Sequence, residues 1–234
     1  MVQNFQTVAL LPMKAHSARV SGKNFREFAG KPLFRWVLDS LLGVGAIDAV
    51  VINTDARDIL ADNGLLDGDA GGRIVIRDRK PEICGDFVSM NMVLADDIDA
   101  VTADNYVMTH TTNPLLRSRT IERALSQYKS SMQKLGADSL FSVNKVQTRF
   151  YREDGSAINH DPDNLIRTQD LETWFEENSN LYIFNRDSFA KTNARIGANP
   201  VMFEMDKTES VDIDGQAEWD MAEAMAVYQQ DKAL

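Results

Sequence analysis

The feature that most constrains this chain is a series of short apolar runs alternating with segments of helical spacing. The first run, residues 7–12, lacks polar alternation, which is typical of a strand buried on both faces of a parallel sheet. After a polar loop, residues 32–42 place apolar side chains at helical spacing behind an early proline. Further strands are predicted at residues 47–53, 73–77, 105–109, 139–143, 180–184 and 201–205, and further helices at 56–63, 88–98, 117–135 and 217–230. This order predicts an α/β fold with a mostly parallel sheet, helices on both faces and ligands at its carboxyl edge.

Composition limits the classes of protein to consider. The 234 residues suit a single domain, and a content of 44% hydrophobic and 26% charged residues is that of a globular chain. A formal charge of −10 argues against nucleic acid as a partner, because duplex binding needs a basic face. Cys84 is the lone cysteine, which fits a reducing cytoplasm. The first residues do not resemble a signal peptide and no apolar run approaches the ~20 residues that cross a bilayer, so we expect a cytoplasmic protein without a membrane partner.

The loop after the first predicted strand is basic. Lys14, Arg19 and Lys23 occur there among small residues. Lysine and arginine side chains, together with exposed backbone amides, bind phosphate oxygens. The spacing matches neither a Walker loop nor GxGxxG, so a solvated loop remains an equal alternative on spacing alone.

A second candidate site lies near the end of the chain, where Asp212 and Asp214 flank Ile213. In an extended backbone the two carboxylates share one face while Ile213 points into the core. Two convergent carboxylates suit a hard cation such as Mg²⁺. Solvated aspartates at an ordinary strand end are the alternative.

Residues 144–178 interrupt the regular pattern. They are polar and irregular, with Gly155 and Pro162 among them. We interpret them as a flap or arm inserted into one domain that spans residues 1–234.

Several motifs, in order along the chain, resemble those of one family. They are residues 11–24 (LPMKAHSARVSGKN) followed by 30–33 (GKPL), 53–55 (NTD), 79–86 (RKPEICGD), 178–183 (NSNLYI) and 210–214 (SVDID). Over almost its whole length the sequence is similar to acylneuraminate cytidylyltransferases, the CMP-sugar synthetases for acidic keto-sugars, with CMP-Kdo synthetases as cousins. The resemblance implies a Rossmann-like three-layer αβα nucleotidyltransferase fold. It also implies that the arm reaches across a homodimer.

The resemblance assigns roles to individual residues. The catalytic set it implies is Lys14, Lys23, Arg19, Asp212 and Asp214, with Mg²⁺ bound by the two aspartates. The nucleotide site it implies comprises Leu11, Lys14, Ser17, Arg19, Lys23, Asn24, Arg79 and Ser89. Contacts to the acidic sugar are expected from His110, Thr112, Arg167, Gln169 and Asn178. A structural role for His110 is the simpler alternative.

The implied reaction joins CTP to an N-acylneuraminate or related nonulosonate and releases pyrophosphate. Kdo, pseudaminate or legionaminate as acceptor remains open, because His110 opens the segment HTTNP where the family has QPTSP. A catalytically silent nucleotide-binding relative is a further alternative. The basis of this alternative is the altered phosphate loop, in which Lys14 replaces the family's arginine and Ala15 and His16 replace its two glycines. A glycosyltransferase is the remaining alternative class, because many of these enzymes bind a metal through Asp-x-Asp. Their motif usually lies in mid-chain, whereas Asp212 and Asp214 lie beside the last predicted helix.

Overall fold

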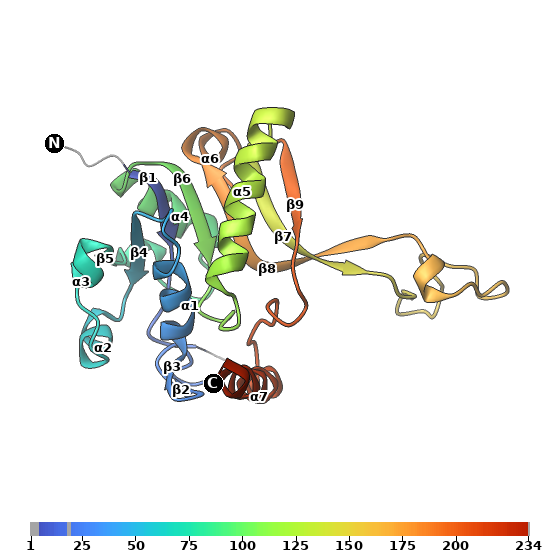
Figure 1. Cartoon of the computed structure of the whole chain (residues 1–234), viewed down its shortest axis with the longest axis horizontal. Helices are drawn as coiled ribbons and strands as arrows, with labels where there is room; N and C mark the ends of the chain where they lie inside the picture. The colour runs from blue at the N-terminus through green and yellow to red at the C-terminus, as the bar shows by residue number, and fades with distance from the viewer. Residues whose placement is uncertain (1–4, 18–19, 234) are drawn as a thin grey trace.

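The computed structural model describes residues 5–17 and 20–233, and its centre is one seven-stranded sheet (Figure 1). The strands, in spatial order, are β5 (Ile74–Asp78), β4 (Ala49–Thr54), β1 (Phe5–Leu10), β6 (Ala103–Thr109), β8 (Trp174–Asn185), β7 (Ser139–Val146) and β9 (Pro200–Glu204). Neighbours pair in parallel, except that β8 runs antiparallel to both β6 and β7. The predicted mostly parallel sheet is confirmed, and the reversed β8 is an addition to it.

Helices cover both faces of this sheet. One face carries α1 (Leu33–Leu42) and α5 (Ser118–Leu135), and the other carries α4 (Met90–Ala100) and α6 (Arg186–Thr192). In β1, Ala9 faces the core under α1 and α5, while Val8 and Leu10 face the core under α4 and α6. Burial of both faces explains why the first apolar run lacks alternation, and the predicted three-layer arrangement is confirmed.

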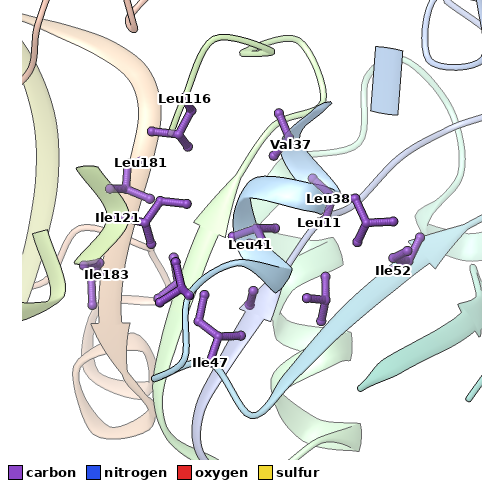
Figure 2. Packing of buried hydrophobic residues seen from close by; sticks show 14 of the residues in the cluster. Leu11, Val37, Leu38, Leu41, Ile47, Ile52, Leu116, Ile121, Leu181 and Ile183 are labelled. Atoms are coloured by element: carbon purple, nitrogen blue, oxygen red, sulfur yellow. The ribbon is translucent and has the colours of Figure 1, made fainter. Parts of the chain in front are cut away.

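The packing of α1 fixes the loop that leads into it. Val37, Leu38 and Leu41 are fully buried in one cluster with Leu11, just after β1, and Ile52 of β4 (Figure 2). Each buried leucine of this kind contributes about 1.5–3 kcal/mol to the free energy of unfolding. Both ends of the segment between β1 and α1 are therefore anchored.

A third cluster joins the last helix to the first loop. The helix α7 (Gln216–Ala233) packs Trp219 edge-on against Phe28, with ring centroids 5.3 Å apart. Phe28 belongs to a short hairpin of β2 (Glu27–Phe28) and β3 (Lys31–Pro32), which turns at Gly30 with φ of 92°. Ile213, fully buried, belongs to the same cluster. The segment that carries the two aspartates is thereby held beside the basic loop.

Four short elements complete the fold. They are the helices α2 (Arg57–Asp62) and α3 (Asp69–Gly72) and the 3₁₀ turns η1 (Pro81–Ile83) and η2 (Thr168–Asp170). Within the described part of the chain, every helix is too short or too polar to cross a membrane.

An arm projects from the sheet (Figure 1). Beyond the sheet, β7 and β8 continue as a two-stranded ribbon, paired from Val143 with Glu177 to Val146 with Trp174. A loop of residues 147–173 forms its tip. The expectation of irregular structure throughout 144–178, with a strand starting only at 180, was wrong at the base of the arm. There the backbone groups of the two strands pair across the ribbon. Residues 175–177 are exposed to solvent and show no apolar alternation, so no strand was recognisable there from the sequence.

Candidate nucleotide and sugar site

A cavity of about 450 Å³ opens where β1, β5 and β6 end. It collects predicted site residues from separate parts of the sequence: Lys14, Ser17, Lys23, Asn24, Arg79, His110, Thr112 and Asp214. This is the carboxyl edge of the parallel strands, where ligands bind in open α/β sheets. Apolar side chains, among them Ile83 and Val93, line part of the wall.

Three predicted nucleotide-site residues lie elsewhere or are not described. Leu11 has a fully buried side chain, and its backbone N–H donates to the Val51 carbonyl at 2.9 Å. Ser89 caps α4 and lines a neighbouring cavity. Arg19 lies outside the described residues.

The residues predicted to contact the sugar lie in three different places. His110 and Thr112 line the main cavity. Asn178 is buried in the sheet, where its Oδ1 accepts from Ser142 at 2.5 Å. Arg167 and Gln169 lie in the arm, and Arg167 pairs there with Asp170 at 2.7 Å. These last two residues do not line the cavity of their own chain.

Hydrogen bonds from neighbouring residues hold the basic loop in place. The backbone N–H of Ala15 donates to Asp55 at 2.7 Å. The Asn24 amide donates to the Lys14 carbonyl at 2.8 Å and accepts from the Thr111 hydroxyl at 2.7 Å. Asn24 is almost fully buried and uses both ends of its side chain in this way. Through these two hydrogen bonds Asn24 fixes the loop that carries Lys14.

Lys14 forms an ion pair with Asp86 in the cavity wall. The ammonium group lowers the pKa of this carboxyl below its usual value, first through the hydrogen bond and then through charge. Next to Asp86, Gly85 has φ of 114°, a conformation that favours glycine. Asp86 lies within the matched segment 79–86, but the resemblance implied no role for it.

The segment around the two aspartates is tied to the cavity by its backbone. The Ile213 N–H donates to the Thr112 carbonyl at 2.9 Å, and Lys23 Nζ donates to the Ile213 carbonyl at 2.6 Å. Ile213 is buried as predicted, although residues 211–214 lie outside any strand. Asp214 lines the cavity, whereas Asp212 is half-buried beside it.

These carboxylates fit Mg²⁺ only as partial ligands. Among the described residues, no group of three or more His, Cys, Asp and Glu side chains could hold a metal by itself. Mg²⁺ commonly takes one or two carboxylates and completes its shell with water and substrate phosphates. The donor set therefore suits an ion that arrives with a triphosphate.

A buried polar network lies behind Arg79. Its Nε donates to the Asn53 Oδ1 at 2.9 Å, and Asn53 in turn donates to Asp97 at 2.8 Å. Arg77 pairs with Asp97 and, at 2.8 Å, with Asp96. Burial raises the pKa of Asp97 to about 6, although the Asn53 hydrogen bond and the Arg77 charge oppose that rise. Sequence reasoning assigned Arg79 to the site but missed the residues that orient it.

His110 is held neutral. Burial is the main cause that lowers its pKa to about 4, and the charges of Arg195 and Lys23 lower it further. At neutral pH the imidazole therefore carries no charge. The positive charge of the cavity comes from its lysine and arginine side chains.

Comparison with known proteins gives consistent matches. A family model described as Cytidylyltransferase matches residues 8–232. An N-acylneuraminate cytidylyltransferase of Streptococcus agalactiae is 24% identical over an alignment 219 residues long, which covers 88% of this chain and 50% of that protein. A CMP-N,N'-diacetyllegionaminic acid synthase of Legionella pneumophila is 25% identical over an alignment 241 residues long, which covers 96% of this chain and 97% of that one. This chain thus spans about half of the Streptococcus protein but nearly all of the Legionella protein.

Solved structures support the same fold. A CMP:2-keto-3-deoxy-manno-octonic acid synthetase complexed with CTP superposes with a TM-score of 0.67 at 16% identity. The match covers 96% of this chain and 99% of the other. With a family model matching nearly the whole chain and a shared Rossmann-like sheet, this protein belongs to the cytidylyltransferase family.

Proposed function

We propose that the chain transfers a cytidylyl group from CTP to an acidic keto-sugar, an N-acylneuraminate or related nonulosonate, to give a CMP-sugar. The observation that carries this proposal is the convergence of Lys14, Lys23 and Arg79 on one cavity of a chain with formal charge −10. A local concentration of cations in an acidic protein suits a compact polyanion such as a triphosphate.

In the proposed reaction the anomeric hydroxyl of the sugar attacks the α-phosphorus of CTP. The new bond joins the sugar oxygen to phosphorus, the bond to the β-phosphate bridging oxygen breaks, and pyrophosphate leaves with that electron pair. Such transfers depend mainly on positioning and on stabilising charge on the phosphate oxygens. We assign this work to Lys14 and Lys23, and the proton of the hydroxyl can pass to a base such as neutral His110.

Mg²⁺ would be held by Asp212 and Asp214 together with phosphate oxygens. Bound there, it would neutralise charge on the triphosphate. Lys23 links the two sites, because it lines the cavity and donates to the carbonyl of Ile213 between the two aspartates.

The proposed assembly is a homodimer in the cytosol, made through the arm. Apolar side chains on the arm are exposed by 53% at Tyr151, 62% at Leu165, 45% at Ile166 and 45% at Phe175. Exposed apolar side chains grouped on one projection favour a protein contact. In a dimer the arm could also bring Arg167 and Gln169 to the partner's cavity.

The test is pyrophosphate release from the purified protein. Each of the four nucleoside triphosphates would be combined with N-acetylneuraminate, legionaminate, pseudaminate and Kdo, with Mg²⁺ or with EDTA. We expect release with CTP and one nonulosonate, and loss of release in EDTA. No release in any combination, with CTP still bound, would favour a silent relative. Preference for another nucleotide would contradict the assignment of CTP.

A further inference from the structure

A second cavity, of about 300 Å³, adjoins the nucleotide cavity. Met90 at the start of α4 lines both, so the two volumes are neighbours across one side chain. Glu177 of β8 and Arg195, between α6 and β9, supply charged groups to the second cavity. A second substrate bound there would lie next to a nucleotide in the first.

Arg195 is fixed in place by Tyr182. Its guanidinium carbon lies 4.1 Å from the centre of the Tyr182 ring, and its Nη2 donates to the Tyr182 hydroxyl at 3.2 Å. Tyr182 is fully buried in β8, and its hydroxyl donates to the Glu177 carboxylate. Stacking on an aromatic ring and a hydrogen bond hold the guanidinium before any ligand arrives.

The guanidinium of Arg195 can pair with an anionic ligand, while the Glu177 carboxylate in the same cavity accepts from Tyr182. Within the described residues, its guanidinium forms no ion pair with a carboxylate, and the Tyr182 hydroxyl accepts its hydrogen bond. Its positive charge extends to His110 in the main cavity, where it contributes to the lowered pKa of that imidazole. A half-buried cation of this kind gains most from a ligand carboxylate, which matches the guanidinium fork.

We propose that Arg195 binds the carboxylate of the acidic sugar and that the second cavity is part of the acceptor subsite. Glu177 accepts hydrogen bonds from hydroxyl or amide N–H groups of the same sugar. The subsite is therefore selective for a polyhydroxylated carboxylic acid. This inference rests on the proposed function, which supplies the acidic acceptor.

The test compares acceptors with and without the carboxylate charge. N-acetylneuraminate, N,N'-diacetyllegionaminate and pseudaminate would each be used as free acid and as neutral methyl ester with the wild type, Arg195→Met and Arg195→Lys. We expect Arg195→Met to raise KM for the free acid about 10- to 100-fold and to leave KM for the ester nearly unchanged. Arg195→Lys keeps the charge without the fork, and an intermediate KM is expected. KM for CTP should change less than about twofold in both variants.

Arg123→Met is the matched control. Arg123 is also stacked on an aromatic ring, 5.4 Å from the centre of Phe203, but it lines neither cavity. All variants would be compared by thermal unfolding. An unchanged KM for the acid in Arg195→Met, or an equal rise for acid and ester, would overturn the inference.

Failure of the proposed function gives a different result. In that case the wild type releases no pyrophosphate with CTP and any acceptor. Calorimetric binding of the free acids and their esters to the CTP-loaded wild type and Arg195→Met then tests Arg195 separately. Tighter binding of an acid than of its ester, lost in Arg195→Met, supports the subsite, and no such difference overturns it.

Discussion

Arg79 donates two hydrogen bonds to Asn53, from Nε to the side-chain oxygen at 2.9 Å and from Nη2 to the backbone carbonyl at 2.8 Å. Asn53 is fully buried and is held in turn by Asp97. Two bonds to one residue fix the plane of a guanidinium group. The orientation of Arg79 in the cavity wall is therefore set by residues behind that wall.

Replacing Asn53 tests this dependence. Asn53→Ser removes the oxygen that receives Arg79 and the amide that reaches Asp97. We expect KM for CTP to rise about 10-fold and the free energy of unfolding to fall by about 1–3 kcal/mol, because buried polar groups lose their partners. Steady-state kinetics and urea denaturation measure the two effects.

The control is Asn105→Ser, near the start of β6, where the amide makes an exposed contact of 3.4 Å to the Gln6 carbonyl. It should leave KM for CTP unchanged. An equal effect of both substitutions would show that Asn53 has no special part in placing Arg79.

Asp97 predicts a pH dependence of stability. Its pKa is about 6 in the folded chain against the ordinary 3.8, so the folded chain retains a proton that the unfolded chain releases between these values. Its contribution to the free energy of unfolding therefore falls, by at most about 3 kcal/mol, as pH rises from about 4 to about 6. Asn at this position cannot titrate. Asp97→Asn should thus gain stability relative to wild type over this range, as measured by urea denaturation at about pH 4 and pH 7. A difference independent of pH would contradict the assignment.

The paired aspartates predict a loss of turnover without loss of the fold. Asp212→Ala and Asp214→Ala should each lower kcat at least about 100-fold, because each removes a proposed ligand of Mg²⁺. Circular dichroism should be unchanged. Asp231→Ala, an exposed position on α7, is the control for removing a carboxylate. Normal Mg²⁺-dependent turnover in either test variant would remove that residue from the metal site.

His110 predicts an unusual titration. Its imidazole should take up a proton with a midpoint near pH 4, as followed by the NMR signal of its ring carbons. Above pH 4 the imidazole is neutral. A change in activity near pH 6.5, the ordinary imidazole pKa, would therefore report the titration of a group other than His110. Arg195→Met should move the midpoint upward, because the arginine charge is one of its causes. A midpoint at the ordinary value of 6.5 would contradict the buried, cationic surroundings.

The arm predicts the oligomeric state. Replacement of residues 148–172 by a short Gly-Ser turn leaves the ribbon from Val143 to Val146 in place. We expect a monomer by light scattering, and a raised KM for the sugar because Arg167 and Gln169 are lost. A dimer that persists would place the interface elsewhere on the protein.

Local patterns in the sequence predicted the central layers of the fold well. The first strand was recognisable because Val8 and Ala9 lie on opposite, equally apolar faces. The reversed direction of β8 left no such trace, since pairing direction depends on distant strands. The short helix α6 was overlooked, although Asn185 and Ser188 form a capping box that was readable in the sequence.

The candidate site was predictable where its residues lie in recognisable motifs, whether close in sequence, as Lys14 and Lys23 are, or far from them, as Arg79 is. The loop carrying Lys14 and Lys23 and the segment ending at Asp214 were both located. Asp97 and Arg195 were not, because their surroundings are built by contacts between separate elements. No spacing rule connects a helix residue such as Asp97 to Asn53 on a neighbouring strand.

One strand, β8, belongs both to the ribbon of the arm and to the sheet beside the second cavity, which Glu177 lines. It carries Glu177 and Tyr182 on a backbone that pairs with β7 at residues 174–177 and 182–184 and with β6 at residues 181–185. A chimaeric protein can therefore receive a foreign arm if the exchange is made between Val146 and Trp174. Such a transplant would alter the choice of partner chain and the contacts made from positions 167 and 169, while Glu177 and Tyr182 would stay in the recipient's own sheet.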